Sequence, residues 1–421
     1  MPSSASPAVS VTTPATALRA TRRRELPPRL AYLHAGAVIG IALFASATPS
    51  PLYEVYRAEW GFSTFMLTVV YALYALGVLT ALLLVGRISD EVGRRPVLLA
   101  SLSALLVATG LFLAADGLGW LIAARTLQGL ATGAALGAAS AALLELHPRR
   151  DPDSAGLANG VFSAGGMASG ALIAALLVQY APAPERLPYV VLLVLFGVLL
   201  AGAAAMPEPV ADRRPLRIQP QRPSVPPAIR RRFLLAGLGV LSSWSIGGIF
   251  LSLGPSLVAH LLETDNHLSG GIAMTALAGS GAVAQVLFHR AAPWRAASLG
   301  SIALAGGMAV IVAAISSDVA WLFFVGAVVA GMGFGVAFLG GLRQLMAVVP
   351  DHHRAEVMSA FYVVAYAALS VPALLAGLVV RSWGQVTTFQ VFGAAVFVLA
   401  LVVAVEAWRT RPGAEAPVVA A

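Results

Sequence analysis

The sequence predicts an all-α membrane protein with twelve transmembrane helices in two pseudo-symmetric six-helix bundles. Of its 421 residues, 58% are hydrophobic and 11% are charged, and the mean hydropathy of +0.83 is too high for a soluble globular chain. The apolar residues gather in twelve stretches of roughly 20 residues, the length that a helix needs to cross a bilayer. A polar segment rich in arginine and proline separates the first six stretches from the last six.

Taken in order, the stretches predict one span each. The expected spans are approximately 31–50, 63–85, 96–115, 119–145, 155–178, 187–206, 233–258, 269–288, 297–315, 320–342, 355–379 and 386–407. They define an N-terminal bundle over 31–206, a linker over 207–232, a C-terminal bundle over 233–408 and a cytoplasmic tail over 409–421.

Residues 1–30 are rich in Ser, Thr, Pro and Ala, which predicts a disordered cytoplasmic tail. A cleaved signal peptide is the alternative, because Ala45, Ser46 and Ala47 after the first apolar stretch resemble a cleavage site. Its removal would leave eleven spans and invert every loop, so we expect the tail.

The arginines set the orientation. With both termini in the cytoplasm, only Arg57, Arg186 and Arg381 lie outside and Arg125 lies within the membrane. The net charge of +8 is therefore a matter of membrane topology, and no basic patch predicts nucleic-acid binding. The basic residues are all arginine, a usage typical of GC-rich bacterial genomes, so we expect a multi-pass protein of a bacterial cytoplasmic membrane.

One short polar run, Gly86–Pro96, joins the second and third stretches. Its two glycines permit a sharp turn or a close helix approach, and Asp90 and Arg94 are spaced for a local ion pair.

This run resembles the loop between the second and third helices of the major facilitator superfamily, Gly-x-Leu-Ala-Asp-Arg-x-Gly-Arg-Lys. Glu91 departs from that pattern, since the family usually has a basic residue there. The resemblance implies the superfamily's fold and transport by alternating access, and it implies a role in the conformational switch for the matching residues, which are Gly86, Asp90, Gly93, Arg94 and Arg95.

The two halves read as copies at an offset of 202 residues, which places Gly129 and Gly133 on Gly331 and Gly335. Four charges have no copy, since the second half has alanine at each matching position. Charges that only one half retains indicate a role in function. Duplicated halves are typical of transporters with a central site. The four are Asp90, Arg94, Arg125 and Glu145.

Glu145 ends the fourth span near the loop of Asp90 and Arg94. We expect the three charges to form a cluster that holds the halves closed on the inside and breaks when the transporter turns inward. The alternative for Glu145 is a solvated carboxylate at the membrane interface.

Arg125 lies inside the fourth span, where an unpaired arginine costs about 2.5–3.5 kcal/mol. With Gln128 it resembles the family's fourth-helix signature Arg-x-x-Gln-Gly. Two interpretations stay open: Arg125 and Gln128 contact an anionic substrate or tune a coupling proton, or Arg125 bonds to carbonyls of the first helix and holds the two helices together.

Aromatic residues in the later spans are the other candidates for substrate binding. Trp244 lies mid-span, and two pairs share a helix face at four-residue spacing. Packing or lipid contact is the alternative for each. The pairs are Phe334 with Phe338 and Tyr362 with Tyr366.

No Asp or Glu lies in the middle of an expected span, so a coupling proton would have to use Asp90, Glu145 or His34. The chain has no cysteine, no metal-ligand spacing of histidines within a span and no phosphate-binding Gly-x-x-x-x-Gly-Lys-Ser/Thr loop, so we expect neither a metal nor a cofactor.

We therefore expect a secondary transporter, not an enzyme, that acts as a monomer in the lipid bilayer. Glycines of the fifth span weakly resemble the signature of drug/proton antiporters, which favours proton-coupled efflux of amphipathic, drug-like compounds. Close helix packing is nevertheless the favoured role of these glycines themselves, because the proline of the signature is missing and the spacing differs. An importer or exchanger of organic anions is the alternative, and a non-transporting membrane sensor is a third possibility. The glycines are Gly160, Gly165, Gly166 and Gly170.

Overall fold

The computed structural model describes residues 25–210, 221–264 and 266–411, and within them twelve helices are long and apolar enough to span a membrane. This confirms the predicted fold class. The twelve are α1 (Pro28–Ala47), α3 (Thr64–Val92), α4 (Arg94–Leu113), α5 (Leu118–Glu145), α6 (Pro152–Tyr180), α7 (Leu187–Ala205), α8 (Arg230–Leu261), α9 (His267–Phe288), α10 (Pro293–Ser317), α11 (Ala320–Met346), α12 (Arg354–Trp383) and α13 (Gln385–Arg409).

Three short elements are additional. Helix α2 (Tyr53–Trp60) follows α1, and two 3-10 turns, η1 (Pro227–Ile229) and η2 (Asp351–His353), precede α8 and α12. The sequence did not predict α2, because eight residues are too few for a period to emerge from an otherwise apolar stretch.

Several helices begin at residues suited to a helix start. Ser63 accepts a hydrogen bond from Met66 N at 3.3 Å and so caps α3. Asp151 caps α6, and the Ser154 hydroxyl that donates to this carboxylate lowers its pKa below the ordinary value. Proline stands in the first turn of α1, α6, α7 and α10, where its missing N–H costs no hydrogen bond.

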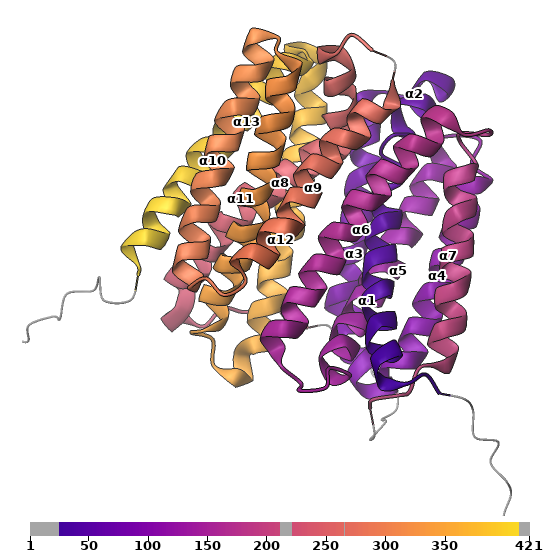
Figure 1. The fold of residues 1–421 in the computed structure, drawn as a ribbon, viewed down its shortest axis with the longest axis vertical. Helices are drawn as coiled ribbons and strands as arrows, with labels where there is room; N and C mark the ends of the chain where they lie inside the picture. The colour runs from indigo at the N-terminus through magenta and orange to yellow at the C-terminus, as the bar shows by residue number, and fades with distance from the viewer. Residues whose placement is uncertain (1–24, 211–220, 265, 412–421) are drawn as a thin grey trace, which may run out of the picture.

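The helices form two side-by-side groups (Figure 1). Helices α1 to α7 make the first bundle, drawn in indigo to magenta, and α8 to α13 make the second, drawn in red to yellow. Both chain ends leave the helices at the same, lower end, which we call the terminal face; the other end is the opposite face. Between the bundles, α3 packs against α12 and α6 packs against α9.

Both bundles show the same close packing of helices at glycine residues. A Cβ at Gly129 or Gly133 of α5 would collide with the backbone carbonyl of Tyr74 or Val78 in α3. In the second bundle, Gly331 and Gly335 of α11 abut the carbonyls of Leu277 and Gly281 in α9 in the same way. The glycines matched at an offset of 202 residues therefore make equivalent helix crossings, which supports the duplication.

Most of the expected tails lies outside the described residues, and so do residues 211–220 of the expected linker. Within the described part, α1 begins three residues before the expected span and α13 extends into the expected tail as far as Arg409. Helix ends differ from sequence-based boundaries because flanking polar residues continue a helix beyond its apolar stretch.

Candidate functional site

The polar run of the sequence forms the turn between α3 and α4. Helix α3 ends at Val92, and Gly93 has a φ of +112°, a conformation that side chains rarely adopt. A Cβ at Gly93 would also meet the Glu208 carboxylate. Glycine is therefore required at position 93 both by its backbone conformation and by the lack of space. Gly86 is a residue of α3 and does not take part in the turn.

Arg94 joins three helix ends. Its guanidinium lies 2.5 Å from Asp90 at the end of α3 and 2.9 Å from Glu145 at the end of α5, and it also donates to Ser89 Oγ at 2.7 Å. The Arg94 side chain is 8% exposed, whereas those of Asp90 and Glu145 are 58% and 33% exposed. The predicted pairing of Asp90, Arg94 and Glu145, hereafter the charge cluster, is thus present in the structure.

All three helices of the charge cluster belong to the first bundle. The contacts that these pairs make fix α3, α4 and α5 to one another, and the expected role in holding the two halves closed stays a prediction. A switch role for the cluster stays a prediction.

Glu208, which follows α7, is a member of this region that sequence reasoning missed. Its carboxylate accepts from the backbone N–H groups of Arg94 and Arg95 at 2.9 and 3.0 Å, so it caps the start of α4. Arg95 in turn donates to Ala204 O of α7. No motif marks Glu208, because it is remote in sequence from the helix that it caps.

Arg125 is completely buried in α5. Its Nη1 donates to Ser46 O of α1 at 3.1 Å and to Gln128 Oε1 at 2.7 Å, and its Nε donates to the Tyr53 hydroxyl at 2.6 Å. Gln128 Nε2 donates to Ala45 O at 3.0 Å. These bonds satisfy carbonyls at the end of α1, so the helix-clamp interpretation describes the contacts that Arg125 makes in this structure.

The guanidinium of Arg125 is also enclosed by rings. Its Cζ lies 5.3, 5.2 and 5.7 Å from the ring centroids of Tyr53, Tyr74 and Phe112. Arg125 Nη2 is the exception, since it is buried and has no hydrogen-bond partner. One donor of Arg125 is therefore still available to a further acceptor.

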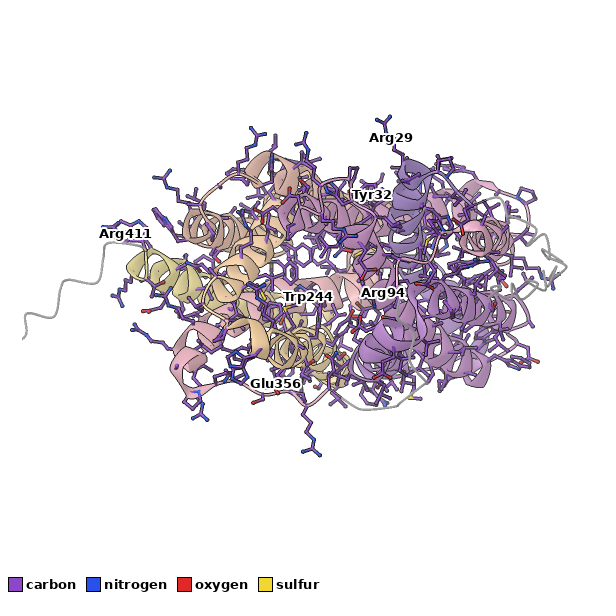
Figure 2. All side chains as sticks on the ribbon, turned by 90° about the horizontal axis from the view of Figure 1, so that it is seen from below. Arg29, Tyr32, Arg94, Trp244, Glu356 and Arg411 are labelled. Carbon is purple, nitrogen blue, oxygen red and sulfur yellow. The ribbon has the colours of Figure 1, made fainter. Side chains whose placement is uncertain are left out.

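A second group of candidates meets between the bundles. The Trp244 ring of α8 lies 5.5 Å from Phe338 of α11 and 5.4 Å from Tyr366 of α12, and Tyr366 packs in one apolar cluster with Tyr74 of α3. We call Tyr74, Trp244, Phe338 and Tyr366 the aromatic cluster. Figure 2 shows Trp244 at the centre of the molecule, between the two bundles.

The remaining aromatic candidates lie beside this cluster. Tyr362 is half-buried and packs against the group of Tyr74 and Tyr366, whereas Phe334 packs within the second bundle, close to Gly247 and Gly281. Two buried polar atoms in the same region have no hydrogen-bond partner, the Trp244 Nε1 and the hydroxyl of Tyr71. Buried polar groups are rarely left unpaired, so both atoms are suited to contact a ligand.

His34 does not join either group. It lies in α1 against Gly202 of α7, inside the first bundle, and its Nε2 is buried without a partner. Among the residues that the structure describes, no three His, Cys, Asp or Glu side chains gather as a metal site would require.

The fold and these two clusters define a membrane transporter built from two six-helix bundles with a polar-aromatic centre. The chain matches the family model of the Major Facilitator Superfamily over residues 35–370 and belongs to that family. It is therefore a transporter of small molecules and not an enzyme. This match confirms the resemblance to the superfamily that the sequence showed.

Two solved structures have the same fold. The human organic anion transporter MFSD10 (TETRAN) superposes with a TM-score of 0.65 at 15% identity, covering 90% of this chain and 100% of that chain. A mutant of the nucleoside transporter NupG superposes with a TM-score of 0.68 at 11% identity, covering 90% and 99%. No curated protein sequence matches the chain.

Proposed function

We propose that this protein exports small, neutral, amphipathic aromatic compounds across a bacterial cytoplasmic membrane in exchange for protons, with both termini in the cytoplasm. We infer the class of substrate from the aromatic cluster between the bundles, in which rings from α3, α8, α11 and α12 meet. A central site contacted by both bundles is exposed to each side in turn when the bundles rock.

The chemistry of this cluster favours a flat ligand with a hydrogen-bond acceptor. Rings supply stacking and apolar contact, and the unpartnered Trp244 Nε1 is a donor only. The Nε and Nη1 groups of Arg125 already donate to Ser46 O, Gln128 and Tyr53, so a substrate could reach only the Nη2 of this side chain.

Transport of organic anions is the second candidate. The human neighbour in fold is named an organic anion transporter, and Arg125 Nη2 is a buried donor without a partner. An anion that reached this atom would find a cation in a low-dielectric site, where the attraction is strong.

Counterflow in proteoliposomes distinguishes the two candidates. Liposomes preloaded with one unlabelled compound take up its labelled form faster than protein-free liposomes only if the protein exchanges it. We expect exchange of neutral aromatic esters and lactones such as coumarin, and no exchange of benzoate. Exchange of benzoate without coumarin would favour the organic-anion function.

Two matched variants test the site. Trp244→Phe keeps a ring but loses the Nε1 donor, and we expect it to raise the KM for coumarin about fivefold, the value of one hydrogen bond. Trp321→Phe changes a tryptophan that is 67% exposed on α11 and should leave the KM unchanged. Equal effects of the two variants would exclude Trp244 from the site.

A further inference from the structure

The linker residues that follow residue 220 contact both bundles, at α3 and at α12. Gln221 N donates to Leu83 O of α3 at 3.0 Å. The Ser359 hydroxyl of α12 donates to Gln221 Oε1 at 2.6 Å and shares its proton with Ala355 O of its own helix at 2.8 Å. One residue of the linker is therefore bonded to both bundles at once.

Two further contacts hold this segment on the second bundle. Ser224 N lies 3.4 Å from Glu356 O of α12, and Val225 packs against the apolar cluster that contains Val357 and Phe361. The segment from Gln221 to Val225 is thus seated on the start of α12, and its contact with α3 is made by the Gln221 backbone.

The same pair of helices is tightly closed at its other end. A Cβ at Gly377 of α12 would collide with the Thr68 side chain of α3 near the opposite face. Other bonds join the bundles there too: the Ser50 hydroxyl donates to Leu251 O at 3.0 Å, and His267 N donates to Gln179 Oε1 at 2.9 Å. In this structure the opposite face is closed while Gln221 bridges α3 and α12 nearer the terminal face.

A bridge of fixed length fits one spacing of the helices that it joins. When the bundles rock so that the opposite face opens, the terminal ends of α3 and α12 move relative to each other, and Leu83 and Ser359 no longer stand at the distance that Gln221 spans. We propose that Gln221 is a latch that stabilises the arrangement closed at the opposite face, and that it must detach in each transport cycle.

The latch concerns the rocking motion and depends on neither the substrate nor the coupling ion. Its test therefore needs no transported compound, and its outcome is separate from that of the proposed function.

A cysteine reporter measures the motion directly. The chain contains no cysteine, so Thr68→Cys introduces a single thiol at a fully buried position that becomes accessible only when the opposite face opens. The rate of labelling by a maleimide in detergent solution then reports the fraction of open molecules.

In the Thr68→Cys protein, Gln221→Leu removes the acceptor and keeps a side chain of similar size. We expect it to raise the labelling rate about fivefold, which corresponds to the net free energy of one hydrogen bond. Ser359→Ala should produce a similar rise, and the double variant should add nothing to the single ones because they lose the same bond. Gln221→Glu, which keeps an acceptor oxygen, should stay within about twofold of the parent.

Arg222→Ala is the matched control, since Arg222 is the exposed neighbour of Gln221. Its labelling rate should equal that of the parent. An unchanged rate in Gln221→Leu would overturn the latch, and so would an equal rise in Arg222→Ala, which would indicate loosening of the whole segment. Additive effects of Gln221→Leu and Ser359→Ala would also contradict it.

Discussion

Arg94 Nη2 lies 2.9 Å from Glu145 Oε1, so the first turn of α4 is fixed to the last turn of α5. Because the same guanidinium pairs with Asp90, three helices of the first bundle meet at one cation. The carboxylates are partly exposed, which makes the cluster a modest source of stability but a rigid connection between helix ends that must move together.

The first prediction follows from that exposure. We expect Arg94→Ala and Asp90→Asn to leave the protein inserted and folded and to lower its free energy of unfolding by about 1 kcal/mol or less. Both variants should slow counterflow at least tenfold. Glu145→Gln should have the same effect as Arg94→Ala, and the double variant should be no worse. Normal turnover in both Asp90→Asn and Arg94→Ala would remove the switch role from the cluster.

The second prediction concerns Glu208. Glu208→Gln keeps the size of the side chain but removes the charge of the carboxylate that accepts from Arg94 N and Arg95 N. We expect the free energy of unfolding to fall by about 0.5–2 kcal/mol. Because Arg94 is held by the same turn, turnover should fall as well. A stability equal to that of the parent would mean that the cap contributes nothing.

The third prediction separates the two interpretations of Arg125. Arg125→Ala leaves Ser46 O and the Tyr53 hydroxyl without their donor in a buried site, so we expect a loss of about 1–3 kcal/mol in stability. Arg125→Lys retains the charge but not the planar guanidinium, so its stability should lie between that of Arg125→Ala and that of the parent. The measurements are thermal unfolding in detergent and coumarin binding to the folded fraction. Loss of binding in a variant of normal stability would favour a substrate contact instead.

The fourth prediction uses two adjacent glycines of α6. A Cβ at Gly166 would collide with the carbonyl of Gly40 in α1, whereas Gly165 has open space around it. We expect Gly166→Ala to lower the thermal unfolding temperature and the yield of monodisperse protein, because backbone must move to admit the methyl group. Gly165→Ala should match the parent. Equal stability of the two variants would show that α1 and α6 are not closely packed.

The sequence was sufficient for the fold because the governing signals are long and redundant. Twelve apolar stretches near bilayer length and one loop motif define the architecture, and each bundle repeats the other. The packing function of Gly166 and of Gly170, which abuts the Phe44 carbonyl, was also the favoured interpretation of those glycines from sequence.

The candidate site was predictable only in part. The pairing of Arg94 with Glu145 could be anticipated, since charges in apolar sequence have few partners. Glu208, Tyr53 and Tyr74 could not, because they reach Arg94 or Arg125 through tertiary packing that leaves no spacing in the sequence. The bridge by Gln221 was hidden for the same reason, in a segment predicted only as a polar linker between the bundles.

We propose that a proton gradient drives this transporter and that the first bundle carries the coupled proton. Within the described residues no Asp or Glu lies in the middle of a spanning helix, so we propose that Asp90 and Glu145, at the terminal ends of α3 and α5, carry the coupled proton. His34, which packs against Gly202 inside the first bundle, is the remaining candidate carrier.

Uptake of labelled coumarin into proteoliposomes with a clamped internal pH and an imposed pH gradient tests this proton coupling. We expect accumulation that follows the gradient and disappears when an ionophore collapses it, and we expect the response to be lost in the Asp90→Asn/Glu145→Gln double variant. Uptake that is the same with and without the gradient would contradict proton coupling, and the protein would then be a uniporter or a substrate exchanger.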